Sequence, residues 1–273
     1  MKKSLALTLM FAIAFAGLAF GQVKAKDGVY FAQETAFAKD SGWKDQVVVT
    51  VAGGKISSVV WNGVSNTGIA DKLWAVANGA YPMVKFGKAK AEWDVQAKAV
   101  ADYLVKTQDP SFSKFKADGT TDAISGASIH VKGFYDLVNK ALASPAVPKG
   151  IYAKSGWFFK AQDDFDAKTG WKDSVLITVV NGTIVDVLWN GTNKDAKMKS
   201  KLVEAIEGRY GMAKAAKKGE WNVQAAAVQD AILKAQDPAK IALKADGTSD
   251  AISGASIHVT AVYLAMDALK AAR

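Results

Sequence analysis

The sequence predicts an α+β protein built from two tandem homologous domains, each a small antiparallel sheet with a β-hairpin packed on helices. Three observations lead to this fold class. The chain repeats itself once, each copy contains β-branched runs separated by turn residues, and each copy continues into segments whose apolar residues recur at helical spacing. A chain of 273 residues also has the length expected of two ordinary domains.

One segment shows the repeat most clearly. Residues 116–131 match residues 244–259 at 15 of 16 positions, and Thr121 opposite Ser249 is the single difference. The period is too long for a solenoid repeat, so we expect two globular domains. The same offset also pairs Gly42-Trp43-Lys44-Asp45 with Gly170-Trp171-Lys172-Asp173, Trp61-Asn62-Gly63 with Trp189-Asn190-Gly191, Glu92-Trp93 with Glu220-Trp221, and Gln108-Asp109-Pro110 with Gln236-Asp237-Pro238.

The domain boundaries follow from the repeat and from the prolines that lie between its two copies. Pro145 and Pro148 lie between the copies and prevent a helix from continuing there. We expect a signal peptide at residues 1–21, a first domain at 22–143, a linker at 144–149 and a second domain at 150–273.

The N-terminus has the pattern of a secretory signal peptide. Lys2 and Lys3 precede an uncharged apolar run at residues 5–20, which is shorter than the roughly 20 residues that span a membrane. Small residues then permit cleavage before Gln22, and Val23-Lys24-Ala25 offers a later alternative. We therefore expect an exported protein, periplasmic or extracellular, that keeps no membrane anchor after cleavage.

Each copy is expected to open with a short aromatic strand, around Tyr30 in the first and Tyr152 in the second. A hairpin follows. In the second copy, β-branched runs at residues 175–180 and 183–189 flank Asn181-Gly182. This residue pair is typical of a type I′ turn, because both central positions need a positive φ.

In the first copy Gly53-Gly54 takes the place of that turn. Amphipathic helices come next in both copies and end before an Asp-Pro pair, and a last helix follows the 116–131 segment and its repeat. The apolar positions that predict these helices are Trp93, Ala97, Val100, Leu104, Val131, Phe134, Val138 and Ala141 in the first copy, and Trp221, Ala225, Val228, Ile232, Val259, Val262, Met266 and Leu269 in the second.

Composition excludes several kinds of chemistry. The chain has no cysteine, which excludes disulfides, thiolate nucleophiles, thiolate-held iron–sulfur clusters and cysteine-type zinc sites. Two histidines are too few for a histidine metal cluster, so we expect no metal site. The formal charge is +9, but the lysines are scattered rather than clustered with aromatic residues, so we expect no nucleic-acid partner.

The repeated segment combines two hydroxyls with two small residues, just before the last helix. It reads Ser125-Gly126-Ala127-Ser128 in the first copy and Ser253-Gly254-Ala255-Ser256 in the second. Small residues let a flat ligand approach the backbone, and a helix start favours a phosphate. The helix dipole contributes about 0.3–1 kcal/mol, whereas micromolar binding needs roughly 8 kcal/mol. A phosphate-bearing cofactor would therefore be retained better if its phosphate were esterified to Ser128 or Ser256.

These segments resemble the FMN-binding domain family. Its members occur in extracytoplasmic subunits of the sodium-pumping quinone oxidoreductase, in related ferredoxin-oxidising complexes and in bacterial extracellular electron-transfer flavoproteins. The family pattern Asp-x-x-Ser/Thr-Gly-Ala-Thr reads Asp122 to Ser128 and Asp250 to Ser256 here, with serine at the last position. The resemblance covers nearly the whole mature chain in two tandem copies.

The resemblance implies a maturation partner, a cofactor and a function. An FAD-dependent FMN transferase would attach one covalent FMN by phosphoester to Ser128 and another to Ser256. The protein would then carry electrons to or from a redox partner protein or membrane electron-transfer complex, rather than act as a stand-alone enzyme. The cofactor-binding residues expected are Trp93, Asp122, Ser125, Gly126, Ala127, Ser128 and His130, with Trp221, Asp250, Ser253, Gly254, Ala255, Ser256 and His258.

Other interpretations of these residues stay open. The two aspartates could hydrogen-bond the amides of their own loop, or help the transferase bind its metal. The histidines could contact the flavin or simply be exposed, the tryptophans could pack in the core or contact the ring, and the serines could cap the last helix. The chain could instead be a tandem binding module or surface antigen without flavin, or the electron-donating component of a reductase whose catalytic subunit is separate.

Overall fold

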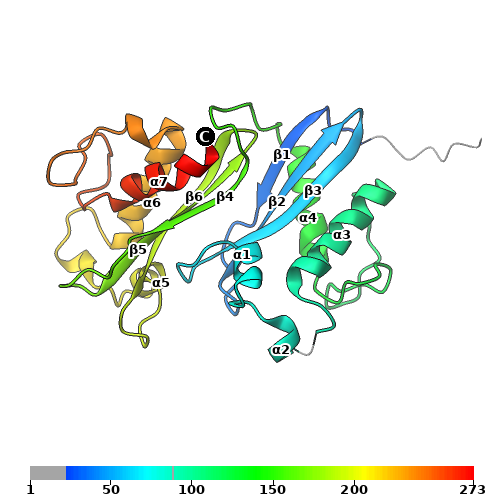
Figure 1. Cartoon of the computed structure of the whole chain (residues 1–273), viewed down its shortest axis with the longest axis horizontal. Helices are drawn as coiled ribbons and strands as arrows, with labels where there is room; N and C mark the ends of the chain where they lie inside the picture. The colour runs from blue at the N-terminus through cyan, green and yellow to red at the C-terminus, as the bar shows by residue number, and fades with distance from the viewer. Residues whose placement is uncertain (1–22, 88) are drawn as a thin grey trace, which may run out of the picture.

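The computed structural model describes residues 23–87 and 89–273, and the predicted signal peptide lies outside this range. Two antiparallel sheets of three strands each, in the orders β1-β2-β3 and β4-β5-β6, occupy the centre (Figure 1). The predicted α+β class of two sheets packed with helices is confirmed. Within the described residues, no helix is long and apolar enough to cross a membrane.

The described residues of the first half, 23–87 and 89–143, contain three strands and four helices. Helix α3 packs on β3, and α4 packs on β1 and β2, so both helices cover one face of the sheet. The bounds are β1 Gly28–Gln33, β2 Trp43–Ala52, β3 Lys55–Ser65, α1 Lys72–Ala77, α2 Met83–Gly87, α3 Trp93–Thr107 and α4 Lys132–Ala143.

The second half repeats this arrangement. Helix α6 packs on β6, and α7 packs on β4 and β5. The bounds are β4 Gly156–Ala161, β5 Trp171–Val180, β6 Thr183–Asn193, α5 Lys201–Ile206, α6 Trp221–Ala235 and α7 Thr260–Leu269, with 3₁₀ helices at Met212–Lys214, Pro238–Lys240 and Lys270–Ala272.

Both predicted hairpin turns are confirmed. Asn181 and Gly182 have φ values of 50° and 76°, and Gly53 and Gly54 have 59° and 71°. These are the left-handed conformations that a two-residue hairpin needs to match the twist of its strands. The hairpins therefore set the register of β2 with β3 and of β5 with β6.

One strand prediction is wrong in the second half. Tyr152 precedes the sheet, whose first strand begins at Gly156, and the strand position equivalent to Tyr30 is held by Phe158. Tyr152 is instead buried against the core, with its amide donating to the Gly182 carbonyl at 3.1 Å. An aromatic residue near a predicted strand indicated burial correctly but not strand pairing.

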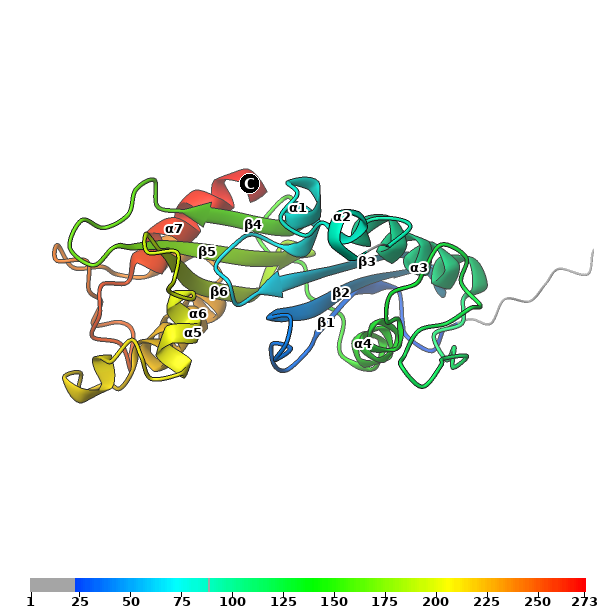
Figure 2. The ribbon, with the colours of Figure 1, turned by 90° about the horizontal axis from the view of Figure 1, so that it is seen from below.

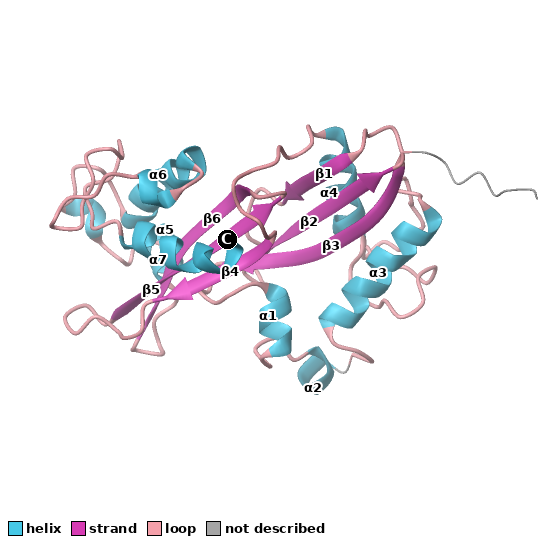
Figure 3. Ribbon diagram, turned by 45° about the horizontal axis from the view of Figure 1, so that its top comes forward, coloured by secondary structure: helices cyan, strands magenta, loops and turns pink. Residues whose placement is uncertain are grey.

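The two halves pack sheet against sheet, with α3 and α4 on the far side of one sheet and α6 and α7 on the far side of the other (Figures 2 and 3). Strand β5 is therefore buried on both faces: Val175 and Ile177 face the helical core, while Leu176 packs with Val64 of the first half. A strand buried on both sides reads as a continuous apolar run. The sequence of β5 has this character, and so does that of β2, although β2 is less completely buried.

A buried polar network holds the halves together. Gln46 is fully buried; its side-chain nitrogen donates to Asp186 at 2.9 Å, and its oxygen accepts from Trp157 at 2.6 Å and Thr178 at 3.1 Å. Lys44 lies 3.6 Å from the same carboxylate. Satisfied polar groups of this kind specify one arrangement, because any other would leave them unpaired in the interior.

Candidate functional site

Each serine segment belongs to a loop that is closed by its own hydrogen bonds. Asp118 accepts from the amide and hydroxyl of Thr120 at 2.9 and 2.7 Å, and Asp246 accepts in the same way from Thr248. These bonds hold the pKa of both carboxyls below its usual value, with a smaller contribution from the nearby histidines. The loops therefore have the same turn in both halves.

Asp122 and Asp250 pair with lysine side chains rather than with the amides of their own loops. Each forms an exposed ion pair at 2.6 Å, Asp122 with Lys116 and Asp250 with Lys244. The loop-closing role that was open to them belongs to Asp118 and Asp246. Exposed ion pairs contribute little to stability, and both carboxylates lie at the surface.

The serines are not helix caps. The N-cap residues of α4 and α7 are Val131 and Val259, and neither makes a side-chain capping bond. The amides of Val131 and Lys132 already donate to the Gly119 carbonyl at 2.9 and 3.2 Å. A phosphate at Ser128 would thus find fewer free helix amides than a helix start normally offers.

A buried glutamine holds each serine instead. Gln96 Oε1 accepts from the Ser128 amide at 2.7 Å and from its hydroxyl at 3.1 Å, and Gln224 Oε1 does the same for Ser256 at 2.8 and 3.2 Å. Both glutamines are almost fully buried, and their nitrogens donate to backbone carbonyls. The amide and the hydroxyl of each exposed serine are therefore both held by a side chain from the interior.

The rest of the segment is divided between the surface and the core. Gly126 and Gly254 have φ values of 85° and 94°, which explains glycine at these positions. Ala127 and Ala255 pack against their respective cores. Ser125 is exposed, and Ser253 lines a different hollow, beside α6, from the one that Ser256 lines.

Ser256 stands at a cavity of about 440 Å³ with aromatic walls. Trp221 and His258, both predicted site residues, line the same cavity. Burial, and the nearby charges of Asp173 and Glu220, raise the pKa of the Tyr210 phenol above its usual value. The lining also includes Trp171, Asp173, Trp189, Lys201, Tyr210 and Met212.

The tryptophans predicted as core or ring contacts serve the core in both halves. Trp93 and Trp221 are each 3% exposed and form edge-to-face pairs with Trp61 and Trp189, at ring-centroid separations of 5.3 and 5.1 Å. Trp221 also contributes to the cavity wall, so packing and lining are compatible. The equivalent set in the first half is Trp43, Asp45, Trp61, Lys72, Tyr81 and Trp93.

Sequence reasoning missed the glutamines and the buried charges of these sites. Gln96 and Gln224, Asp45 and Asp173 are identical at the repeat offset, which was a usable signal. Lys72 and Lys201 were harder to find, because the second copy has one extra residue before this position and the two lysines therefore do not align at the common repeat offset.

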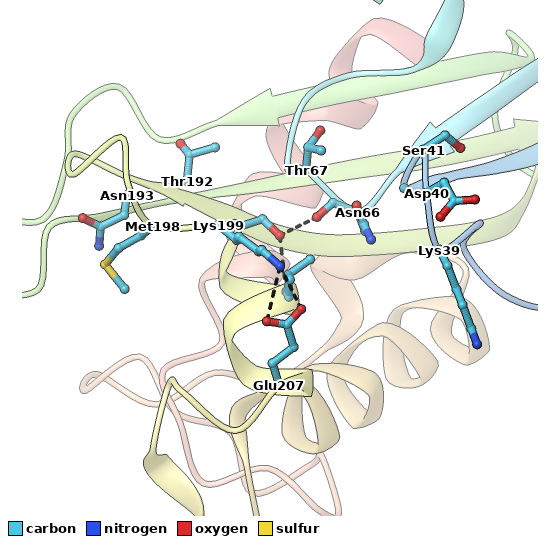
Figure 4. Close-up of a pocket in the computed structure, with 13 residues that line it drawn as sticks. Lys39, Asp40, Ser41, Asn66, Thr67, Thr192, Asn193, Met198, Lys199 and Glu207 are labelled. Carbon is cyan, nitrogen blue, oxygen red and sulfur yellow. Dashed lines mark hydrogen bonds and ion pairs between the residues drawn. The ribbon is translucent and has the colours of Figure 1, made fainter.

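A larger cavity of about 570 Å³ lies at the junction of the two halves (Figure 4). It contains the Lys199–Glu207 ion pair at 3.0 Å and the hydrogen bond from Ser200 to the Asn66 carbonyl. Lys199 and Arg209 hold the pKa of Glu207 below its usual value. None of the predicted site residues lines this cavity, so we assign it to the domain junction.

Each half is an α+β unit with an exposed serine held by a buried glutamine, and in the second half this serine lies at a cavity whose aromatic walls suit a planar ligand. Residues 42–143 match the model of the FMN-binding domain family. Residues 42–143 are therefore an FMN-binding domain.

Two solved structures are similar to about half of the chain. A Clostridium thermocellum protein solved by NMR in solution is 50% identical, with 45% of this chain and 95% of that chain covered and a TM-score of 0.36. A Clostridium perfringens protein solved by crystallography is 21% identical, with 45% and 89% covered and a TM-score of 0.33. No curated protein matches the chain.

Proposed function

We propose that the protein is an exported electron carrier with one FMN esterified to Ser128 and a second to Ser256. The observation that carries the proposal is the pair of exposed serine hydroxyls, each held in the same geometry by a buried glutamine within a repeated segment. The match of residues 42–143 to the FMN-binding domain family supports the cofactor in the first half. Near-identity of the second segment extends the proposal to the other half.

The residues of the second half fit a flavin. Three tryptophans and a tyrosine give the cavity apolar, planar walls, while Ser256 and His258 supply polar groups at the same cavity. Attachment by the transferase would form the serine Oγ–P bond, break the pyrophosphate bond of FAD, release AMP and free the hydroxyl proton. When bound, FMN supplies the electron-transfer chemistry, and the protein supplies position and electrostatics.

The direct test uses protein exported by its native host. Its band on a denaturing gel should fluoresce under ultraviolet light, and its intact mass should exceed that of the chain by two FMN less two waters. Protein made without the transferase is the control and should carry neither. Unmodified protein from cells with active transferase would contradict the proposal and favour a binding module without flavin.

The mature N-terminus should be Gln22.

The glutamines give a second expectation. Gln224→Met removes the acceptor for both Ser256 bonds, so the loop loses its support and FMN attachment at Ser256 should slow about tenfold, or about 1.4 kcal/mol, the size of one or two net hydrogen bonds. Attachment should be followed by intact mass during reaction with the transferase and FAD.

Gln224→Glu is the matched control for this variant. It keeps an oxygen acceptor of the same reach and should retain more of the attachment rate than Gln224→Met, while Ser128 in the same molecule should be modified at the normal rate. Equal rates for Gln224→Met and the parent protein would show that the glutamine does not position the serine.

A further inference from the structure

Both halves bury a lysine at the same place in the fold. Lys72 and Lys201 begin helices α1 and α5 and are 6% and 7% exposed, although lysine is among the residues least often buried. Lys72 Nζ lies 3.0 Å from Asp45, and Lys201 Nζ lies 2.5 Å from Asp173. Each half thus contains one enclosed ion pair.

The carboxylate of each pair has a second donor. The indole nitrogen of Trp61 donates to Asp45 at 3.0 Å, and that of Trp189 donates to Asp173 at 3.2 Å. The two aspartates are therefore satisfied on both sides. Each lysine ammonium is held by its aspartate and also faces aromatic rings.

Each ammonium lies over three aromatic rings. Lys201 Nζ is 5.2 Å from the centre of the Trp221 ring, 5.7 Å from Trp171 and 5.9 Å from Tyr210. In the first half the separations are 4.5 Å to Trp93, 5.3 Å to Trp43 and 5.5 Å to Tyr81. Ring faces attract cations at such separations, so the charge is held in the wall of the site.

In the second half this charge belongs to the cofactor cavity. Lys201, Asp173 and the three rings line the same cavity as Ser256. A buried ion pair is weak evidence for a stabilising role, since apolar residues of similar volume usually serve the fold as well or better. The presence of the pair in both halves therefore points to a use at the site itself.

We propose that Lys72 and Lys201 each raise the midpoint potential of the FMN held in their own half. This inference rests on the proposed function. On reduction the flavin ring takes up two electrons from the donor and one proton from water, and so gains one negative charge. An ammonium in the cavity wall favours that charge, and a water-excluded site strengthens the effect.

The test uses the loaded protein with the Ser128→Ala change, so that only the flavin on Ser256 is observed. Its potential is measured by reduction with dithionite against a reference dye. Lys201→Met should lower the potential, with at least a tenfold loss in the reduced-to-oxidised ratio at fixed ambient potential, which is about 30 mV for a two-electron couple. Asp173→Asn should raise it, because the ammonium loses its counter-charge while the Trp189 bond keeps an acceptor.

Three further variants make the result decisive. Lys197→Met removes an exposed positive charge from the same half and should leave the ratio within twofold of the parent. Lys201→Arg should retain the high potential. The double variant Lys201→Met/Asp173→Asn leaves no unpaired charge, so it can be measured even if Lys201→Met does not fold, and its potential should lie below that of Asp173→Asn, from which it differs only in the lysine.

The outcomes separate this inference from the proposed function. Shifts of the same sign in Lys201→Met and Asp173→Asn, or a shift in Lys201→Met no larger than in Lys197→Met, would overturn the role of the lysine. Absence of FMN from the parent protein, seen by intact mass before any titration, would instead overturn the proposed function. Opposite shifts in the two variants would support the inference, since general loosening of the site would move both potentials the same way.

Discussion

Ser128→Ala is expected to remove one of two covalent flavins, and Ser128→Ala with Ser256→Ala to give a colourless protein of unchanged fold. The substitution removes only the side-chain hydroxyl, which is the group that forms the ester. The Ser128 amide keeps its bond to Gln96, and the side chain is exposed, so the loop should persist. Intact mass and in-gel fluorescence measure the loss, and circular dichroism measures the fold.

Two variants in the same loop serve as controls. Ser113→Ala removes an exposed hydroxyl that lies outside the family pattern and should leave both flavins in place. Ser128→Thr keeps an acceptor hydroxyl and should restore modification, because the family pattern has threonine at this position. If Ser128→Ala protein still carries two flavins, the acceptor lies elsewhere and the site assignment is wrong.

Phe134→Ala should cost the first half about 3–5 kcal/mol of stability. Phe134 is fully buried, and its ring centre lies 4.9 Å from that of Trp61 and 5.2 Å from that of Tyr135. Truncation leaves a cavity between α4 and the sheet, which close packing cannot refill. Urea unfolding of protein without flavin, followed by tryptophan fluorescence, gives the change in the free energy of unfolding.

The repeat supplies a matched control for this change. Val262 occupies the same position in the second half and is also fully buried, but Val262→Ala removes fewer atoms and should cost less. Since the halves can unfold separately, the transitions are analysed with one midpoint for each. A loss below about 1 kcal/mol for Phe134→Ala would show that the packing of Phe134 against Trp61 and Tyr135 contributes little to the stability of the first half.

Short-range patterns predicted much of this fold. The hairpins followed from Asn181-Gly182 and Gly53-Gly54, whose positive φ values suit one kind of turn. The helices α3 and α6 followed from apolar spacing, and each ends in a left-handed glutamine, Gln108 or Gln236, just before Asp-Pro. Tyr152 was misassigned because an aromatic residue before a sheet can be buried by packing without strand pairing.

The candidate site was predicted only in part. The repeated segment pointed to Ser128 and Ser256, because identity over 15 of 16 positions is visible without any structure. The contribution of Trp221 to the cavity wall and the ion-paired role of Asp122 were not decided by that pattern. Both depend on which neighbours the folded chain brings close.

The sequence by itself determined the duplication, the two hairpins, the helices α3, α4, α6 and α7, and the serine segments, since all of these depend on residues close along the chain. Only the tertiary structure decided that Gln96 supports Ser128, that Lys201 pairs with Asp173 beneath aromatic rings, and that Gln46 of one half bonds Asp186 of the other. Each of these contacts joins segments far apart in sequence. Packing of the sheets and helices chooses such partners, because a buried polar group must find one wherever the fold places it.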